Sequence, residues 1–315
     1  MILNFLFAAI KGGVPLLYGT TGEIITQKSG SLNLGVEGMM CMGAYMGFYV
    51  AYKTNNLLLA ILGAFLLGAF GALIYAILTI TFMANQNVTG LTLTIFGTGF
   101  ANFFGSRMIA ASDGAPKLSD SMIALLAEKK IPVLGDIPVL GKLLFSHNLL
   151  VYVSVLLAIV LGLYIKKTRA GLTMRAVGEN PAAADAAGIN VTRTKYIHVL
   201  LGGGICGVGG AYISLVNGQG IWNNNCVNGL GWIAVALVIF ASWSPIKAIL
   251  GSFLFGAFSA FYLYVPKDII AIPDAFYKML PFLATIIVLI ISSMKKNKEN
   301  AQPASCGLNY YREER

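Results

Sequence analysis

Long apolar segments recur along the whole chain, and polar stretches separate them. A helix needs about 20 apolar residues to cross the hydrocarbon core of a bilayer. The pattern therefore predicts about nine transmembrane helices, within residues 3–26, 36–52, 57–83, 88–105, 147–165, 196–216, 230–243, 245–264 and 274–293. The stretch 230–243 is short, and whether it spans fully is left open. The chain is predicted to be an all-α, polytopic integral membrane protein with a single transmembrane domain over residues 1–315.

Basic residues set the predicted orientation. Residues 166–195 carry six Lys or Arg side chains, and the tail at about 294–315 carries Lys295, Lys296 and Lys298. Cytoplasmic loops collect Lys and Arg, so both segments are predicted to be cytoplasmic. Counting the spans backwards places residues 106–146, a loop with a predicted interfacial helix, on the extracytoplasmic side together with the N-terminus.

Composition excludes several other classes. Hydrophobic residues make up 57% of the 315 residues and charged residues only 11%, against about 25% charged in soluble domains. The net charge is +9, and the positive residues cluster between and after the spans, which is typical of orientation signals, so no nucleic-acid partner is expected. The four cysteines lack metal-type spacing, so neither a metal site nor a disulfide framework is predicted.

The loop GLTMRAVGENPAAADAAGIN, residues 171–190, predicts a short capped helix. Asn180 is a strong N-cap, Pro181 suits the first helical position, and Gly188 is a good stop. The loop is either a plain connector or a docking element whose small alanine face lets another protein approach. The candidate docking residues are Arg175, Gly178, Glu179, Asn180, Pro181, Ala184, Ala187 and Gly188.

The segment SGSLNLGVEGMM, residues 29–40, places polar groups at the start of a span. Asn33 can cap a helix, and Glu37 in the first turn favours the positive end of its dipole. Alternatively, the glycine-broken segment lines a translocation path, because ionisable groups in membranes are functional candidates. Asn87, Thr89 and Thr92 form a second polar stripe, suited to a path or to hydrogen bonds between helices. The candidate path residues are Ser29, Gly30, Asn33, Glu37, Asn87, Thr89 and Thr92.

Two glycine patterns resemble nucleotide-binding motifs but lack their context. Residues 202–207 match GxGxxG inside an apolar run with no preceding strand, so Gly203 and Gly207 are predicted to form a small-residue packing face. Between Gly135 and Lys142 the spacing is too long for a phosphate loop, and Leu143 stands where Ser or Thr is needed. No cofactor, and no ATP site in this chain, is expected.

Four separated segments resemble bacterial ABC-importer permeases of the branched-chain amino acid, ribose and nucleoside group. RAVGENPAAADAAGI is similar to their cytoplasmic coupling-helix region, and SGSLNLGVEGMMCMGA to their early signature. GWIAVALVIFASWSPIKAILGSFLFG resembles their late spans, and ANQNVTGLTLTIFGTGF resembles the nucleoside branch more than the ribose branch. The resemblance covers nearly the whole chain and keeps the order of the segments.

The resemblance implies a permease subunit that is not an enzyme and that forms the translocation path for nucleosides or simple sugars. It also implies a multi-pass location in the bacterial cell (inner) membrane. The implied partners are a cytoplasmic ABC ATPase subunit that binds the ATP, a second, similar permease subunit in a hetero- or homodimer, an extracytoplasmic substrate-binding protein and the lipid bilayer.

Alternative functions stay open. A branched-chain amino acid permease belongs to the same group. A stand-alone secondary transporter or channel would be expected to show coupling-ion residues inside its spans. A membrane enzyme would need paired acids or a His/Cys centre, whereas His147 and His198 stand alone in the sequence.

Overall fold

The computed structural model describes residues 2–112, 114–130, 132, 135, 137, 139–264, 274–294 and 301–312. Within these residues the regular elements are helical, as predicted. The longer helices are α1 (Ile2–Lys28), α2 (Val36–Thr54), α3 (Leu57–Ala76), α4 (Gln86–Ala110), α7 (Leu149–Lys167), α10 (Val191–Tyr212), α12 (Pro245–Tyr264) and α13 (Asp274–Met294). The shorter ones are α5 (Asp120–Leu126), α6 (Leu140–Leu144), α8 (Arg169–Glu179), α9 (Pro181–Ala186) and α11 (Leu230–Phe240). Two π-helical turns, η1 (Ile77–Thr81) and η3 (Ile213–Asn217), extend α3 and α10.

Each predicted span coincides with one of these helices. Among the described helices, four are long and apolar enough to cross a membrane by themselves: α1, α3 with η1, α7, and α10 with η3. Their outward faces carry large apolar side chains, which suits contact with lipid. Examples on α3 and α7 are Leu58, Leu62, Leu66, Phe70, Leu156 and Leu163, all more than one-third exposed.

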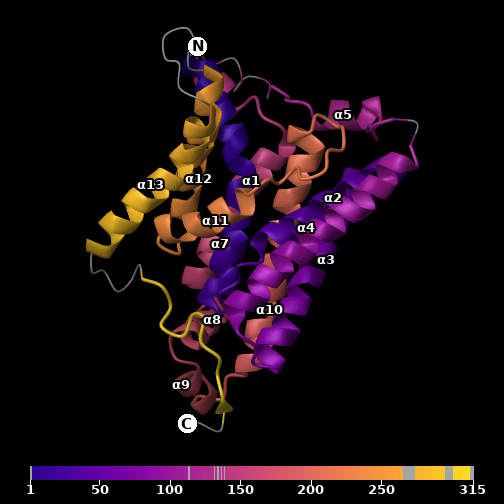
Figure 1. Ribbon diagram of the computed structural model, residues 1–315. Helices are drawn as coiled ribbons and strands as arrows, with labels where there is room; N and C mark the ends of the chain where they lie inside the picture. Colours follow the sequence, from indigo (N-terminus) through magenta and orange to yellow (C-terminus); the bar gives the residue numbers. More distant parts are fainter. Residues whose placement is uncertain are drawn as a thin grey trace.

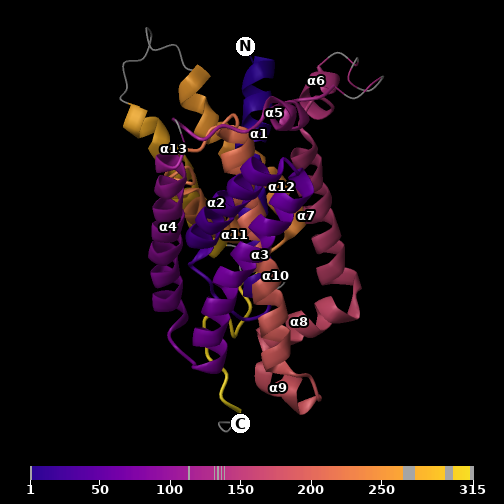
Figure 2. The same ribbon diagram turned by 90° about the vertical axis from the view of Figure 1, so that its right-hand side faces the viewer.

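The longer helices run between two opposite ends of the molecule, several of them obliquely (Figure 1). The N-terminus, α5 and α6 lie at one end, which we call the α5 end. Helices α8 and α9 and the C-terminal residues lie at the other, the α9 end, and the perpendicular view shows the same separation (Figure 2). The predicted interfacial helix within residues 106–146 and the basic loop 166–195 therefore occupy opposite ends of the molecule.

Helix α10 lies at the centre of the bundle and packs against α1, α2 and α3. Glycines permit this close approach, since a Cβ on Gly203 would overlap the Ala72 methyl, and one on Gly207 would overlap the backbone of Ala64. The sequence prediction of a small-residue packing face at these two glycines is confirmed. Such faces bring backbones into van der Waals contact, which drives helix association in lipid.

One span is broken. Helix α11 has 11 residues, which at 1.5 Å per residue makes it about 16 Å long, roughly half of the hydrocarbon core. The chain reaches it through a non-helical segment, residues 218–229, that follows η3. At the α5 end this segment pairs with the loop before α5, where Leu118 N–H donates to Gly220 O at 2.8 Å. The uncertain span 230–243 is thus a half-helix preceded by a segment of turns.

Candidate coupling surface and translocation path

The short helix predicted at the α9 end is present with its caps. The Asn180 side chain accepts the Ala183 N–H at 2.9 Å, and Pro181 occupies the first helical position of α9. Gly188 has φ +82°, the left-handed conformation expected of a stop. A second helix, α8, precedes it and is capped by Thr168, whose hydroxyl accepts the Gly171 N–H at 3.0 Å. The two helices form a compact projection at this end (Figure 1).

The alanine face of α9 is divided between the interior and the surface. Ala184 is buried and packs with Val177 and Val191. The prediction that Ala184 lies on the open docking face is therefore wrong. One side of α9 packs against α8 and α10, and Ala184 lies on that side. Ala183, Ala187 and Gly188 are exposed and form the outward surface.

Glycine contacts join α8 to the loop between α1 and α2. A Cβ on Gly178 would overlap the Lys28 carbonyl, and Gly30, with φ +88°, lies against the Gly178 backbone. Arg175 is half-buried, while Glu179 is exposed and accepts the Ala304 N–H at 3.3 Å. Ser29 is fully buried, and its hydroxyl donates to Thr26 O at 2.7 Å. Ser29 and Gly30 therefore belong to the contact between α1 and α8 at the α9 end.

Residues 301–312, which we call the C-terminal strap, fold back over this contact between α1 and α8. The Ser305 hydroxyl donates to Gly178 O at 2.5 Å, and Tyr310 OH donates to Asp185 Oδ2 at 2.8 Å. At the other side, Asn309 Nδ2 donates to Met83 O at 2.5 Å. One strap thus connects α8, α9 and the turn between α3 and α4. No sequence pattern indicated it, because its partners lie far away in the chain.

Glu37 is buried at the junction between α2 and α11. It lies in the first turn of α2, as predicted, and is 7% exposed. Its two carboxylate oxygens accept the N–H groups of Gly229, at 2.7 Å, and Gly231, at 2.6 Å. These donors are among the orphan N–H groups at the start of α11. The carboxylate therefore closes the N-terminus of the half-helix.

Asn33 is also buried, but it does not cap α2. The N-cap of α2 is Gly35, which has no side-chain cap. Asn33 Oδ1 instead accepts the Gly35 N–H at 2.8 Å, which forms an Asx turn, and its own N–H donates to Glu23 Oε1 at 3.1 Å. The predicted cap is wrong because the turn places Asn33 two residues too early.

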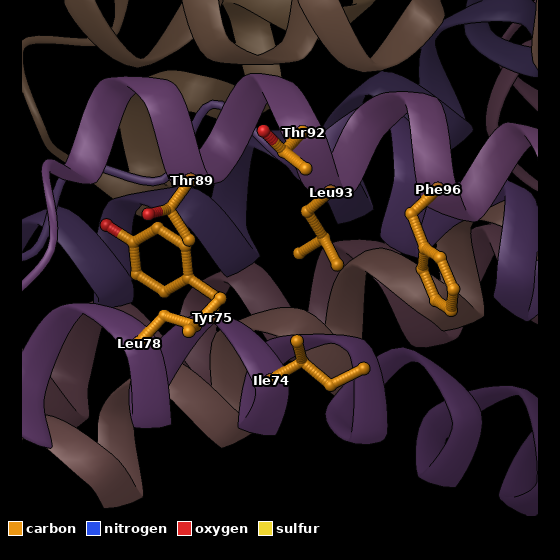
Figure 3. A pocket seen from close by; sticks show the side chains of 7 residues that line it. All are labelled: Ile74, Tyr75, Leu78, Thr89, Thr92, Leu93 and Phe96. Carbon is orange, nitrogen blue, oxygen red and sulfur yellow. The ribbon is translucent and has the colours of Figure 1, made fainter. Parts of the chain in front are cut away.

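The second predicted stripe is split between two environments. Asn87 and Thr92 are exposed, whereas Thr89 is buried. The two threonine hydroxyls donate within α4, to Asn85 O at 2.8 Å and to Val88 O at 2.9 Å. Thr89 and Thr92 line a cavity of about 170 Å³ between α3 and α4 (Figure 3). Its other lining residues are Ile74, Tyr75, Leu78, Leu93 and Phe96, so this cavity is mostly apolar.

A longer polar ladder on α4 was not singled out from the sequence. Thr94, Thr98, Asn102 and Ser106 recur every four residues and so share one face of the helix. Asn102 Nδ2 donates to Asn225 Oδ1 at 2.6 Å, and Asn224 Nδ2 donates to Ser106 Oγ at 2.9 Å. The four-residue spacing is a signal that the sequence contains. The segment before α11, which contacts Asn102 and Ser106 of this ladder, is recognisable as their partner only in three dimensions.

Comparison with known proteins gives one family. Residues 4–289 match the branched-chain amino acid transport system permease component family. The chain is 36% identical to the putative glucose ABC transporter permease protein TsgC13 of Haloferax volcanii, over 82% of this chain and 77% of that protein. It is 34% identical to the guanosine ABC transporter permease protein NupQ of Bacillus subtilis (90% and 89% covered). It is 32% identical to the nucleoside ABC transporter permease protein NupC of Lactococcus lactis (94% and 93%).

Compared with solved protein structures, the chain has no match. The family match nevertheless covers almost all of the helices described above, from α1 into α13. Members of this family are membrane-spanning transport components, not enzymes, and as ABC permeases they work with an ATPase and a substrate-binding protein. This chain belongs to the ABC transporter permease family of the branched-chain amino acid transport system type.

Proposed function

We propose that this permease forms the translocation path of an importer for nucleosides. The observation that carries the proposal is the identity of 32–34%, over at least nine-tenths of the chain, to permeases named for nucleosides and guanosine. Similarity over that length includes nearly all of the helices. In this proposal, the chain sits in the inner membrane of a bacterial cell as a single domain, with the α9 end in the cytoplasm.

The outward surface of α9 is the proposed docking site of the ATPase. Its support is mechanical: α9 is capped at both ends, and Ala184 fixes it to α8 and α10. Small exposed residues, Ala183, Ala187 and Gly188, let a partner approach closely. The contact of Gly178 with the α1–α2 loop connects the docking site mechanically to the spans. A second, similar or identical permease subunit and a binding protein at the α5 end complete the proposed importer.

A sugar is the second candidate substrate, and a specific observation favours it. The relative named for glucose is 36% identical to this chain, over 82% of its length. A branched-chain amino acid is the third candidate, and it rests on the description of the family alone.

Uptake measurements distinguish these substrates. We expect cells that lack this gene to lose high-affinity uptake of labelled purine nucleosides and to regain it when the gene is restored. Uptake of glucose, ribose and leucine in the same cells serves as the comparison. Normal nucleoside uptake with lost glucose or ribose uptake would move the assignment to sugars.

A further inference from the structure

The start of α11 lies level with the middle of α4, which is one of the predicted spans. Helix α4 has 25 residues, which at 1.5 Å per residue makes it about 37 Å long and enough to cross the hydrocarbon core. Gly97, near its midpoint, lies against the Gly38 backbone. The neighbouring Glu37 binds the N–H groups of Gly229 and Gly231. The chain before α11 therefore runs from the α5 end to the level of the middle of α4 without forming a helix.

The described contacts follow this descent along α4. Trp222 is buried against Tyr45 and Phe48, and its indole N–H donates to Asn224 Oδ1 at 2.9 Å. Asn224 then reaches Ser106, and Asn225 reaches Asn102 one helical turn deeper. The Asn225 N–H also donates to Asn102 Oδ1 at 3.1 Å, so the two residues exchange two hydrogen bonds.

The outer side of this segment is polar and open. Asn224, Asn225 and Asn228 are exposed on the subunit, at the depth of α4 residues 97–106. Within the described part of the chain, no hydrogen bond of the Asn228 side chain is found. Non-helical backbone and free amides cannot face lipid, because no water is there to satisfy them. They are tolerated only where protein buries them or where they line a water-filled cavity.

We propose that Asn102, Ser106, Asn224, Asn225 and Asn228 form one wall of the translocation path in the half nearer the α5 end, and that they bind uncharged solutes rich in hydrogen-bonding groups. This inference rests on the proposed function and gives it a site. Amides and hydroxyls can both donate and accept, which matches the hydroxyls and ring nitrogens of nucleosides. The five side chains of this wall are uncharged, so they offer no counter-charge to a zwitterionic amino acid.

Backbone geometry offers a competing reason for the asparagines. Asn225 and Asn228 have φ of +57° and +48°, and asparagine tolerates this left-handed region better than most residues. Glycine tolerates it as well and lacks the amide. Asn225→Gly therefore keeps the backbone conformation and removes the amide, including its hydrogen bond to Asn102. A change in this variant shows that the side chain is needed, and not only the backbone conformation.

Thiol accessibility tests the location. Asn228→Cys is placed in a cysteine-free chain, expressed with its ATPase, partner permease and binding protein in intact cells, and treated with a charged, membrane-impermeant thiol reagent. The matched control is Phe103→Cys, which lies next to Asn102 on α4 and is 58% exposed in this subunit. We expect Asn228→Cys to react, to lose uptake on reaction, and to be protected by excess nucleoside, while Phe103→Cys stays unreactive.

A second measurement tests the role of the wall in substrate selection. We expect Asn102→Ala and Asn225→Gly to raise the KM for nucleoside roughly three- to tenfold, the effect of losing one hydrogen bond, at unchanged membrane abundance. An unreactive Asn228→Cys in an importer with normal membrane abundance and normal co-purification of the ATPase would show that the second permease or another surface covers this wall, and would overturn the inference. So would normal KM values in both variants. If the wild-type importer takes up no nucleoside while Asn228→Cys still reacts, the proposed substrate fails and the path location stands.

Discussion

Glu37 accepts the Gly231 N–H at 2.6 Å across 194 residues of sequence. The carboxylate thus belongs to the first turn of one helix and closes the N-terminus of another. This contact fixes where the half-helix α11 starts, and therefore where the non-helical segment before it ends. Each carboxylate oxygen accepts one N–H group, from Gly229 or from Gly231. Removing either oxygen therefore leaves one of these N–H groups unpaired.

Removing this cap should destabilise the permease. We expect Glu37→Ala to lower the free energy of unfolding by about 2 kcal/mol, because it leaves buried donors unsatisfied. Glu37→Gln keeps one acceptor oxygen and should have a smaller effect. The measurement is the midpoint of thermal unfolding in lipid nanodiscs, together with uptake. The control is Glu128→Gln, whose ion pair with Lys11 is exposed and should contribute almost nothing. Equal midpoints for Glu37→Ala and the control would show that the cap is unimportant.

Replacement by a large side chain should have different effects at Ala184 and at Ala187. Ala187 is exposed, so we expect Ala187→Arg to insert into the membrane normally and to lose co-purification of the ATPase. Ala184 is buried against Val177 and Val191, so Ala184→Arg should reduce the amount of folded subunit itself. Both variants are quantified in the membrane fraction before ATPase binding is compared. Full ATPase binding and full uptake by Ala187→Arg would remove α9 as the docking surface.

The C-terminus of α9 depends on a residue in the left-handed backbone conformation. Gly188 has φ +82°, which costs a β-branched residue roughly 1–2 kcal/mol. We expect Gly188→Val to displace the end of α9 and to abolish ATP-driven uptake, whereas Gly188→Asn, which tolerates this conformation, should keep most of it. The readout is uptake per unit of permease in the membrane. If valine and asparagine behave alike, the conformation of this residue is irrelevant to transport.

The C-terminal strap should protect Cys306. Burial raises the pKa of the Cys306 thiol to about 11, so little reactive thiolate is present at pH 8. We expect Cys306 to react with a thiol reagent at least about tenfold more slowly than an ordinary exposed cysteine. Asn309→Ala removes the hydrogen bond to Met83 O and should increase the rate. The assay uses a chain in which Cys306 is the only cysteine, in inside-out vesicles. An unchanged rate in Asn309→Ala would mean that this contact does not hold the strap.

Orientation in the membrane can be measured directly. Single cysteines at Ser119, near the α5 end, and at Thr168, beside α8, are introduced into a cysteine-free chain. We expect an impermeant thiol reagent to label Ser119→Cys in intact cells and to label Thr168→Cys only after permeabilisation, because the basic loop 166–195 should face the cytoplasm. The opposite pattern would invert the proposed topology.

The sequence alone determined the helical membrane architecture of this protein. The length of the apolar segments predicts the spans, since a helix satisfies its backbone groups within one segment and needs no distant partner. The caps at Asn180, Pro181 and Gly188 were predictable for the same reason, because a helix end uses residues within one turn of itself. Gly203 and Gly207 indicated a packing face through their spacing alone.

The tertiary structure decided which distant residues meet. Glu37 looks like a first-turn acid in the sequence, but its carboxylate closes a helix that begins at Leu230. Ala184 resembles its neighbouring alanines, and only the packing of α9 on α8 and α10 turns it inward. Asn102 and Asn225 pair across 123 residues. A hydrogen bond of this kind depends on how helices and loops are placed in space, and local sequence patterns carry no information about that placement.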